Sequence, residues 1–217
     1  MPFNRPGVGL WISAAALMTE CLNLAAANPA QAQAVQWKGN GHFYEVVAEP
    51  DGITWTQARA AAKARGGYLV SLTSKEENRF AWSFIAEKTQ YWTKSLREGE
   101  SDAVGPWIGL VQIRHQAMEP DKSWRWVSKE PLEYTKWAPG KPNNLQEIED
   151  YAHYFSGAGG PKKGTWNDIS NDPLQLKGVQ AQRLIAYIVE YNSDPSRQQN
   201  KVLTHTKLYF ADISWLC

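Results

Sequence analysis

Short blocks of apolar and polar positions along the first half of the chain predict alternating strands and helices. Residues 42–47 are rich in aromatic and β-branched side chains after a Gly-Asn-Gly turn, which predicts a strand. Residues 55–65 carry a run of alanine behind a capping Thr54 and end at two glycines, so they predict a helix. A short apolar strand is expected at residues 68–72.

The pattern continues with a second helix and several further strands. Residues 74–88 open with Ser-Lys-Glu-Glu, the form of a capping box, and place Phe80, Phe84 and Ile85 at helical spacing. Charged residues with glycine predict a loop at 97–105, and a long polar loop is expected at 139–163. The remaining apolar segments predict strands at 106–110, 123–127 and 183–190.

The N-terminal segment has the pattern of an export signal. Arg5 precedes a largely apolar stretch at 8–27, and Ala-Gln-Ala at 32–34 is a small-x-small cleavage site, so cleavage is expected after Ala34. An uncleaved membrane anchor is the alternative, although Glu20 and Asn23 interrupt the apolar run. The expected organisation is a signal at 1–34, one domain at 35–191 and an extension at 192–217, either strand or disordered, with no stable membrane span after cleavage.

Composition narrows the functional classes. The 217 residues include 23 basic and 22 acidic side chains, for a net charge of +1, which gives no support to a nucleic-acid partner. The chain has 11 tryptophans but only two cysteines, Cys21 in the predicted signal and Cys217 at the last position. An exported domain at 35–191 would therefore form no internal disulfide and would depend on its aromatic core.

Six motifs in order, from about Gly41 to Tyr191, resemble the C-type lectin-like domain family. That resemblance implies an α+β fold, with two helices flanking small antiparallel sheets and a long loop region. It also implies that most of the tryptophans are core or loop-supporting side chains. The motifs are Trp55-x-x-Ala58-Arg59, Gly66-Gly67-Tyr68-Leu69-Val70-Ser71-Leu72, Trp107-Ile108-Gly109-Leu110, Trp124-x-Trp126 followed by Trp137, Trp166-Asn167-Asp168, and Tyr187-Ile188-Val189-Glu190.

The same resemblance implies a combined calcium and carbohydrate site. Its oxygen donors, expected both as metal ligands and as carbohydrate-binding residues, are Asn143, Glu149, Asn167 and Asp168. Ca²⁺ takes about 6–8 oxygen ligands, and vicinal sugar hydroxyls would complete such a shell. The resemblance therefore implies Ca²⁺ as the cofactor and a carbohydrate or glycoconjugate as the partner.

Lys141 departs from the family pattern, which has Glu or Gln before the Pro of this loop. An ammonium in that position removes a ligand and should weaken calcium binding steeply. Three alternatives remain open from the sequence. The lysine points to solvent while water or Gln146 completes the shell, or Glu147 supplies the missing charge, or the site is free of calcium.

The chain also departs from the family at all four positions of its two disulfides. Ala62 and Val189 stand where the resemblance implies one pair, and Tyr151 and Asn171 where it implies the other. Loss of each bridge removes about 2–5 kcal/mol of stability, which other packing must offset.

The sequence therefore predicts a secreted, non-enzymatic domain, extracellular or periplasmic, that binds carbohydrate with the help of calcium. A calcium-independent protein-interaction or adhesion module of the same fold is the alternative. The acidic group Glu147, Glu149 and Asp150 could form a glycosidase pair, but its place beside Pro142-Asn143 favours ion binding.

Overall fold

The fold is a curved, connected sheet with two short helices. The structure, a computed structural model, describes residues 33–97, 100–113, 122–157 and 163–197. Its α-helices are α1 (Trp55–Ala64) and α2 (Lys75–Ser83), and single 3₁₀ turns lie at Thr89–Tyr91, Leu145–Glu147 and Pro173–Gln175. The strands are β1 (Val35–Gln36), β2 (Phe43–Ile53), β3 (Tyr68–Leu69), β4 (Thr93–Arg97), β5 (Glu100–Gln112), β6 (Trp124–Trp126), β7 (Tyr151–Ser156), β8 (Thr165–Ile169) and β9 (Leu184–Tyr191).

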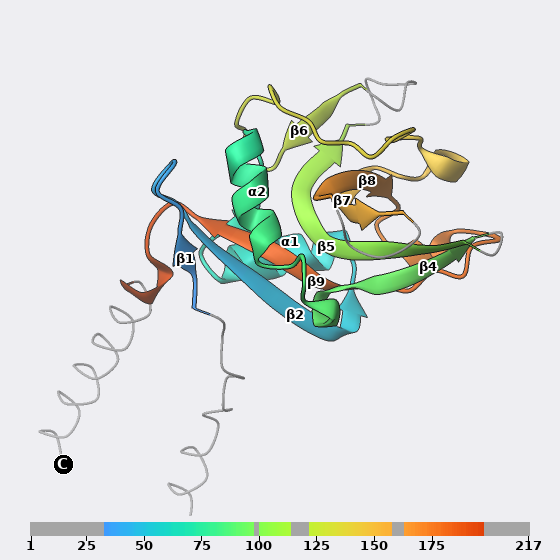
Figure 1. Cartoon of the computed structure of the whole chain (residues 1–217), viewed down its shortest axis with the longest axis horizontal. Coiled ribbons are helices and arrows are strands. Elements are labelled where there is room, and N and C mark those ends of the chain that lie inside the picture. Colours follow the sequence, from blue (N-terminus) through green and yellow to red (C-terminus); the bar gives the residue numbers. More distant parts are fainter. Residues whose placement is uncertain (1–32, 98–99, 114–121, 158–162, 198–217) are drawn as a thin grey trace, which may run out of the picture. The chain divides into compact units, whose positions relative to one another are not determined.

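Strand β5 organises the sheet. The main strand order is β1-β2-β9-β5-β7-β8, with β3 paired to β9 and both β4 and β6 paired to β5. Figure 1 shows β5 as a long curved strand that reaches from β4 to β6. Its contact with β9 is parallel, and the other pairings are antiparallel. The late strands β7 and β8 are thereby brought beside the loop that precedes them.

Helix α1 confirms the sequence prediction in its position and its cap. Thr54 accepts a hydrogen bond from the N–H of Gln57, and the Gln57 side chain accepts one from the N–H of Thr54, which together form a capping box. The helix is followed by Gly66 at φ = 83°, a left-handed conformation that suits glycine. Ala58 and Ala62 face the core and are fully buried.

Helix α2 begins where predicted but ends earlier. Ser74 caps it through the N–H of Glu77, whereas the Glu77 carboxylate turns to Thr73 instead of closing a capping box. The helix ends at Ser83 and not at residue 88. Residues 84–88 continue as isolated turns that place the Ile85 side chain, 0% exposed, in the core.

Two segments predicted as loops are strands. In the segment expected as a loop at 97–105, Arg97 belongs to β4 and residues 100–105 belong to β5, and these two strands pair Thr93 with Val104 and Lys94 with Ala103. Residues 151–156, inside the predicted loop at 139–163, form β7 between β5 and β8. In both cases the strand is stabilised by pairing with distant segments, which local polarity does not reveal.

The tryptophans of the motifs are core residues, as predicted. Trp55, Trp107, Trp126 and Trp166 are at most 2% exposed. The indole N–H of Trp55 donates to the carbonyl of Ile108 at 2.9 Å, and that of Trp107 donates to the carbonyl of Ile53 at 2.9 Å. These indoles therefore join segments far apart in the chain while burying large apolar areas.

The positions where the resemblance implies disulfides are occupied by packed side chains. Ala62 and Val189 are both 0% exposed and belong to the same apolar cluster. Tyr151 packs on Trp55 with ring centroids 4.7 Å apart, and the Asn171 amide oxygen accepts from the N–H of Thr56 at 3.0 Å. Tyr151 and Asn171 therefore both contact the first turn of α1, and neither cysteine of the chain lies among the described residues.

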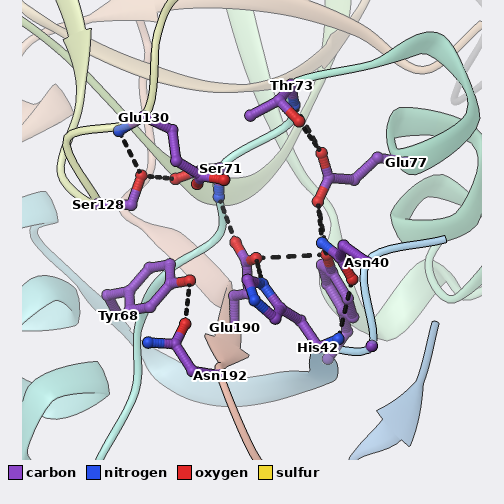
Figure 2. A network of polar contacts seen from close by, with 12 residues as sticks. Asn40, His42, Tyr68, Ser71, Thr73, Glu77, Ser128, Glu130, Glu190 and Asn192 are labelled. Carbon is purple, nitrogen blue, oxygen red and sulfur yellow. Dashed lines mark hydrogen bonds and ion pairs between the residues drawn. The ribbon is translucent and has the colours of Figure 1, made fainter. Parts of the chain in front are cut away.

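A buried acidic network joins β2, α2 and β9 (Figure 2). Glu190, 0% exposed, accepts from the N–H of Ser71 at 2.9 Å and contacts the His42 ring at 2.6 Å. Glu77, 1% exposed, accepts from the N–H of Thr73 at 2.6 Å and from the Tyr44 hydroxyl at 2.5 Å. The Tyr44 hydroxyl also lies 3.3 Å from Glu190 and so links the two carboxylates.

The network makes the protonation of Glu190 part of the folding equilibrium. Burial raises the pKa of Glu190 from 4.5 to about 7, although the hydrogen bonds from His42 and Ser71 oppose the rise. The nearby carboxylates of Glu77 and Glu130 raise it further. Near pH 6 the folded state therefore holds a proton that the unfolded chain has released.

We predict that the free energy of unfolding falls as the pH rises from about 4.5 to about 7, because a raised carboxyl pKa stabilises the fold only below that range. The loss should be on the order of 2–3 kcal/mol. Glu190→Gln should flatten this part of the pH profile in urea unfolding. Glu76→Gln, an exposed carboxylate on the same helix as Glu77, is the control, and an equal flattening in both variants would contradict the assignment.

Candidate functional site

The candidate site is the loop at residues 138–150 where it lies against β8. The loop begins beside β8, where the N–H of Ala138 donates to the carbonyl of Trp166 at 2.8 Å. The N–H of Lys141 then donates to the carbonyl of Ala138 at 3.0 Å, and the Lys141–Pro142 peptide is cis. This turn directs residues 143–149 back towards the end of β8.

Asp168 attaches the loop to β8. Its carboxylate is 0% exposed and accepts from the N–H of Asn143, at 3.0 Å from each oxygen, and from the N–H of Asn144 at 2.6 Å. Burial raises the pKa of Asp168, whereas these backbone hydrogen bonds and the charge of Lys141 oppose the rise. The carboxylate is therefore an integral acceptor for the loop backbone.

Glu149 closes the other end of the loop. Its side chain, 3% exposed, accepts from the N–H of Leu145 at 2.7 Å, and its own N–H donates to the Asn144 amide oxygen at 3.1 Å. Asn144 therefore contacts both acidic residues, the carboxylate of Asp168 through its N–H and the backbone N–H of Glu149 through its amide oxygen. Two acidic residues that are 19 positions apart are thus joined through one loop residue.

Asn167 is fixed by a buried histidine. His153, 0% exposed, has its Nδ1 atom 2.7 Å from the carbonyl of Tyr154, so Nδ1 donates and Nε2 accepts. Burial lowers the pKa of His153 to about 3, and the ring is therefore neutral. The Nε2 atom lies 3.4 Å from the Asn167 amide nitrogen, which also donates to the carbonyl of Asp168 at 2.6 Å.

The Asn167 amide oxygen is left as a buried acceptor. Because the amide nitrogen faces His153 and the carbonyl of Asp168, the oxygen lies on the opposite side of the amide group. It is buried and has no hydrogen-bond partner among the residues that the structure describes. A buried polar atom of this kind costs free energy unless a small polar group or ion reaches it.

Lys141 lies within the loop and does not extend to solvent. Its ammonium donates to the Asn143 amide oxygen at 2.8 Å and lies 5.7 Å from the centre of the Phe155 ring. Two other residues, Gln146 and Glu147, were expected as possible substitutes in a calcium shell. The Gln146 side chain instead donates to the carbonyl of Lys177 at 2.7 Å and accepts from its N–H at 3.1 Å, and Glu147 is exposed.

The structure therefore brings all four predicted site residues together, but their oxygens are largely engaged. Asn143 accepts from an ammonium, Asp168 from two backbone N–H groups, and Glu149 from a third. Among the described residues, no group of three or more His, Cys, Asp or Glu side chains is placed to hold a metal ion. In this arrangement the donor set does not fit a Ca²⁺ ion, which requires about 6–8 oxygens at 2.3–2.6 Å and repels the ammonium.

Sequence reasoning missed two residues of this site. The sequence gives His153 no metal-binding spacing, yet this side chain orients Asn167 from the core. The signal that could have found it is the run of apolar and aromatic residues around it in β7, which is typical of a strand buried on both faces. No signal in the sequence predicts that the Lys141 side chain points into the loop, because a lysine beside a proline can just as well extend to solvent.

Comparison with known proteins places the chain in a family. Residues 51–175 match the model described as the Lectin C-type domain. The chain belongs to the C-type lectin domain family. It is 31% identical to a perlucin-like protein of Mytilus galloprovincialis over 135 residues, which are 62% of this chain and 70% of that protein. It is also 28% identical over 121 residues to a C-type lectin of Cerberus rynchops, covering 55% of this chain and 65% of that one.

Solved structures confirm the predicted fold class. The C-type lectin CEL-I of Cucumaria echinata superposes with a TM-score of 0.50 at 21% identity, over 75% of this chain and 97% of that one. Human lithostathine superposes with a TM-score of 0.51 at 17% identity, over 74% of this chain and 97% of that one. In the part of the chain that the structure describes, we find no helix with the length and apolar character needed to span a membrane.

We predict that Asp168→Asn loosens the loop at residues 143–144, because an amide in place of the carboxylate presents a donor to backbone N–H groups. The expected cost is about 2–4 kcal/mol in unfolding free energy. Amide hydrogen exchange of Asn143 and Asn144 should accelerate, whereas exchange in α1 should change little. Asp51→Asn, at an exposed carboxylate of β2, should change neither the unfolding free energy nor the exchange rates. Unaltered exchange of Asn143 and Asn144 in Asp168→Asn would contradict the attachment of the loop by Asp168.

Proposed function

We propose that this protein is a non-enzymatic carbohydrate-binding domain whose binding surface is the loop at residues 138–150 over β8. The observation that carries the proposal is the convergence of Asn143, Glu149, Asn167 and Asp168, the four residues that the family resemblance implied. Membership of the C-type lectin domain family supports the ligand class. One structural neighbour, with a TM-score of 0.50 at 20% identity, is itself described as a carbohydrate-recognition domain of a mouse scavenger receptor.

The chemistry of the loop suits a polyhydroxylated ligand. Each sugar hydroxyl both donates and accepts hydrogen bonds, so it requires donors and acceptors side by side. Three partly buried residues supply such groups at the loop surface. Lys141 supplies an ammonium group, and Asn143 and Asn144 each supply a side-chain amide with its N–H donors and its carbonyl oxygen. The carboxylates below them are buried and support the loop rather than forming its outer surface.

The proposal does not include calcium as a requirement. C-type lectin domains commonly bind Ca²⁺, and the sequence resemblance implied such an ion here. The engaged oxygens of Asn143, Asp168 and Glu149 instead support a site that binds sugar directly. A calcium-independent adhesion module that binds protein remains the competing function and is separated by the experiment below.

Export is part of the same proposal. The apolar stretch and small-x-small site at residues 1–34 support secretion, and this segment lies outside the described residues. N-terminal sequencing of the protein recovered from the medium or periplasm should begin at Val35. A mature protein that still begins at Met1 and sediments with membranes would contradict cleavage.

We predict that the full chain binds a subset of glycans on an array, in chelator as well as in calcium. Asn143→Ala should reduce affinity for the best glycan about 10-fold in titration calorimetry, because a polar partner of the sugar hydroxyls is lost. The backbone N–H of residue 143 remains, so its bond to Asp168 and the fold should be preserved, whereas loss of the amide acceptor for Lys141 should lower the melting temperature. Asn192→Ala, at an exposed position directly after β9 whose side chain accepts from the Tyr68 hydroxyl, is the matched control and should bind normally.

Absence of glycan binding by folded protein would reject the proposed function. Binding to a protein ligand that survives enzymatic removal of its glycans, and that Asn143→Ala weakens, would establish the adhesion alternative instead. Equal loss in Asn143→Ala and Asn192→Ala would show that the loop is not the binding surface.

A further inference from the structure

We propose that the ammonium group of Lys141 is the resident cation of the loop site, so that a side chain of the protein does the electrostatic work of a bound metal ion. This inference rests on the site defined under the proposed function and specifies how that site is held together. It makes Lys141 a positioning residue, which acts through Asn143 and the buried carboxylates.

The first argument is the position of the ammonium. Its nitrogen lies 2.8 Å from the amide oxygen of Asn143, one of the four side chains expected to hold a cation. The backbone N–H of the same residue lies 3.0 Å from both carboxylate oxygens of Asp168. Asn143 therefore connects the cationic side chain to the buried anion, with its amide oxygen on one and its N–H on the other.

The second argument is charge balance in a region of low dielectric. Asp168 and Glu149 are 0% and 3% exposed, and carboxylates so deeply buried require a compensating charge. Lys141 supplies one positive charge, which reaches Asp168 through Asn143. The backbone N–H groups of Asn143, Asn144 and Leu145 supply partial positive charge for the rest.

The third argument is a second contact that holds the lysine in the loop. The ammonium lies 5.7 Å from the centre of the ring of Phe155, a residue that is 9% exposed. The position of the cation is therefore set on two sides, by Asn143 and by Phe155.

A cation that belongs to a side chain differs from a dissolved metal ion in one respect. Its occupancy does not depend on the concentration of metal or on the presence of a chelator, because the cation is part of the chain. A Ca²⁺ ion added at the same place would meet the ammonium at close range and would be repelled. The loop should therefore keep its conformation in calcium-free conditions.

The test compares full-length protein with variants of two lysines. In thermal melts, the wild type should show the same melting temperature in calcium and in chelator. Lys141→Met keeps the length of the side chain but removes its charge, and it should lower the melting temperature by about 3–8 °C in both buffers. Lys136→Met, the same change at an exposed lysine, is the control and should melt as the wild type does.

A second variant restores the expected ligand. Lys141→Glu replaces the cation by a carboxylate, so this variant should acquire Ca²⁺ binding in titration calorimetry and melt at least a few degrees higher with calcium than with chelator. The wild type should show no heat of calcium binding. Calcium binding by the wild type, or an unchanged melting temperature in Lys141→Met, would overturn the proposal, as would the absence of calcium binding in Lys141→Glu.

These measurements involve no sugar, so the two proposals fail separately. If no glycan binds but the lysine variants behave as expected, the proposed function is wrong and the resident cation stands. If glycan binding disappears in chelator and returns with calcium, carbohydrate binding stands and the resident cation is wrong.

Discussion

The candidate site depends on one buried carboxylate. Asp168 is 0% exposed on β8 and accepts the N–H groups of Asn143 and Asn144, which lie 25 and 24 positions earlier. The loop backbone has no regular structure of its own around these residues, so its N–H groups require acceptors from elsewhere. Two further contacts of the site depend on this attachment. Asn144 is placed to reach Glu149, and Asn143 is placed to receive the ammonium of Lys141.

The aromatic core stabilises this loop in a domain whose described residues include no cysteine. Indole N–H groups of Trp55 and Trp107 donate to backbone carbonyls more than 50 positions away, and Tyr151 packs on Trp55. A disulfide stabilises mainly by restricting the unfolded chain, whereas these contacts act in the folded state by burial and hydrogen bonding. The strands that carry the site are therefore supported from beneath by packing.

Two regions of the domain bury paired carboxylates, and they balance the charge differently. Beneath the loop, Asp168 and Glu149 are compensated by backbone N–H groups and by one ammonium. Between β2, α2 and β9, Glu190 and Glu77 share the hydroxyl of Tyr44, and burial raises the pKa of Glu190 to about 7. Burial raises the pKa of Asp168 as well, but there the backbone N–H groups and the charge of Lys141 oppose the rise. Around Glu190 the neighbouring carboxylates add to the rise, so its protonation makes stability sensitive to pH near neutrality.

The sequence alone determined the elements whose signals are local and the family to which they belong. The cap of α1 at Thr54 could be read from neighbouring positions, because capping acts within a few residues. The buried tryptophans and the four residues of the candidate site were implied by the resemblance of the motifs to the family. Only the tertiary structure decided that residues 93–97 pair with residues 100–104, that His153 orients Asn167, and that Lys141 turns inward. Those outcomes depend on strand register and on partners far apart in the chain, and a charged or polar side chain carries no local signal of the partner it will meet.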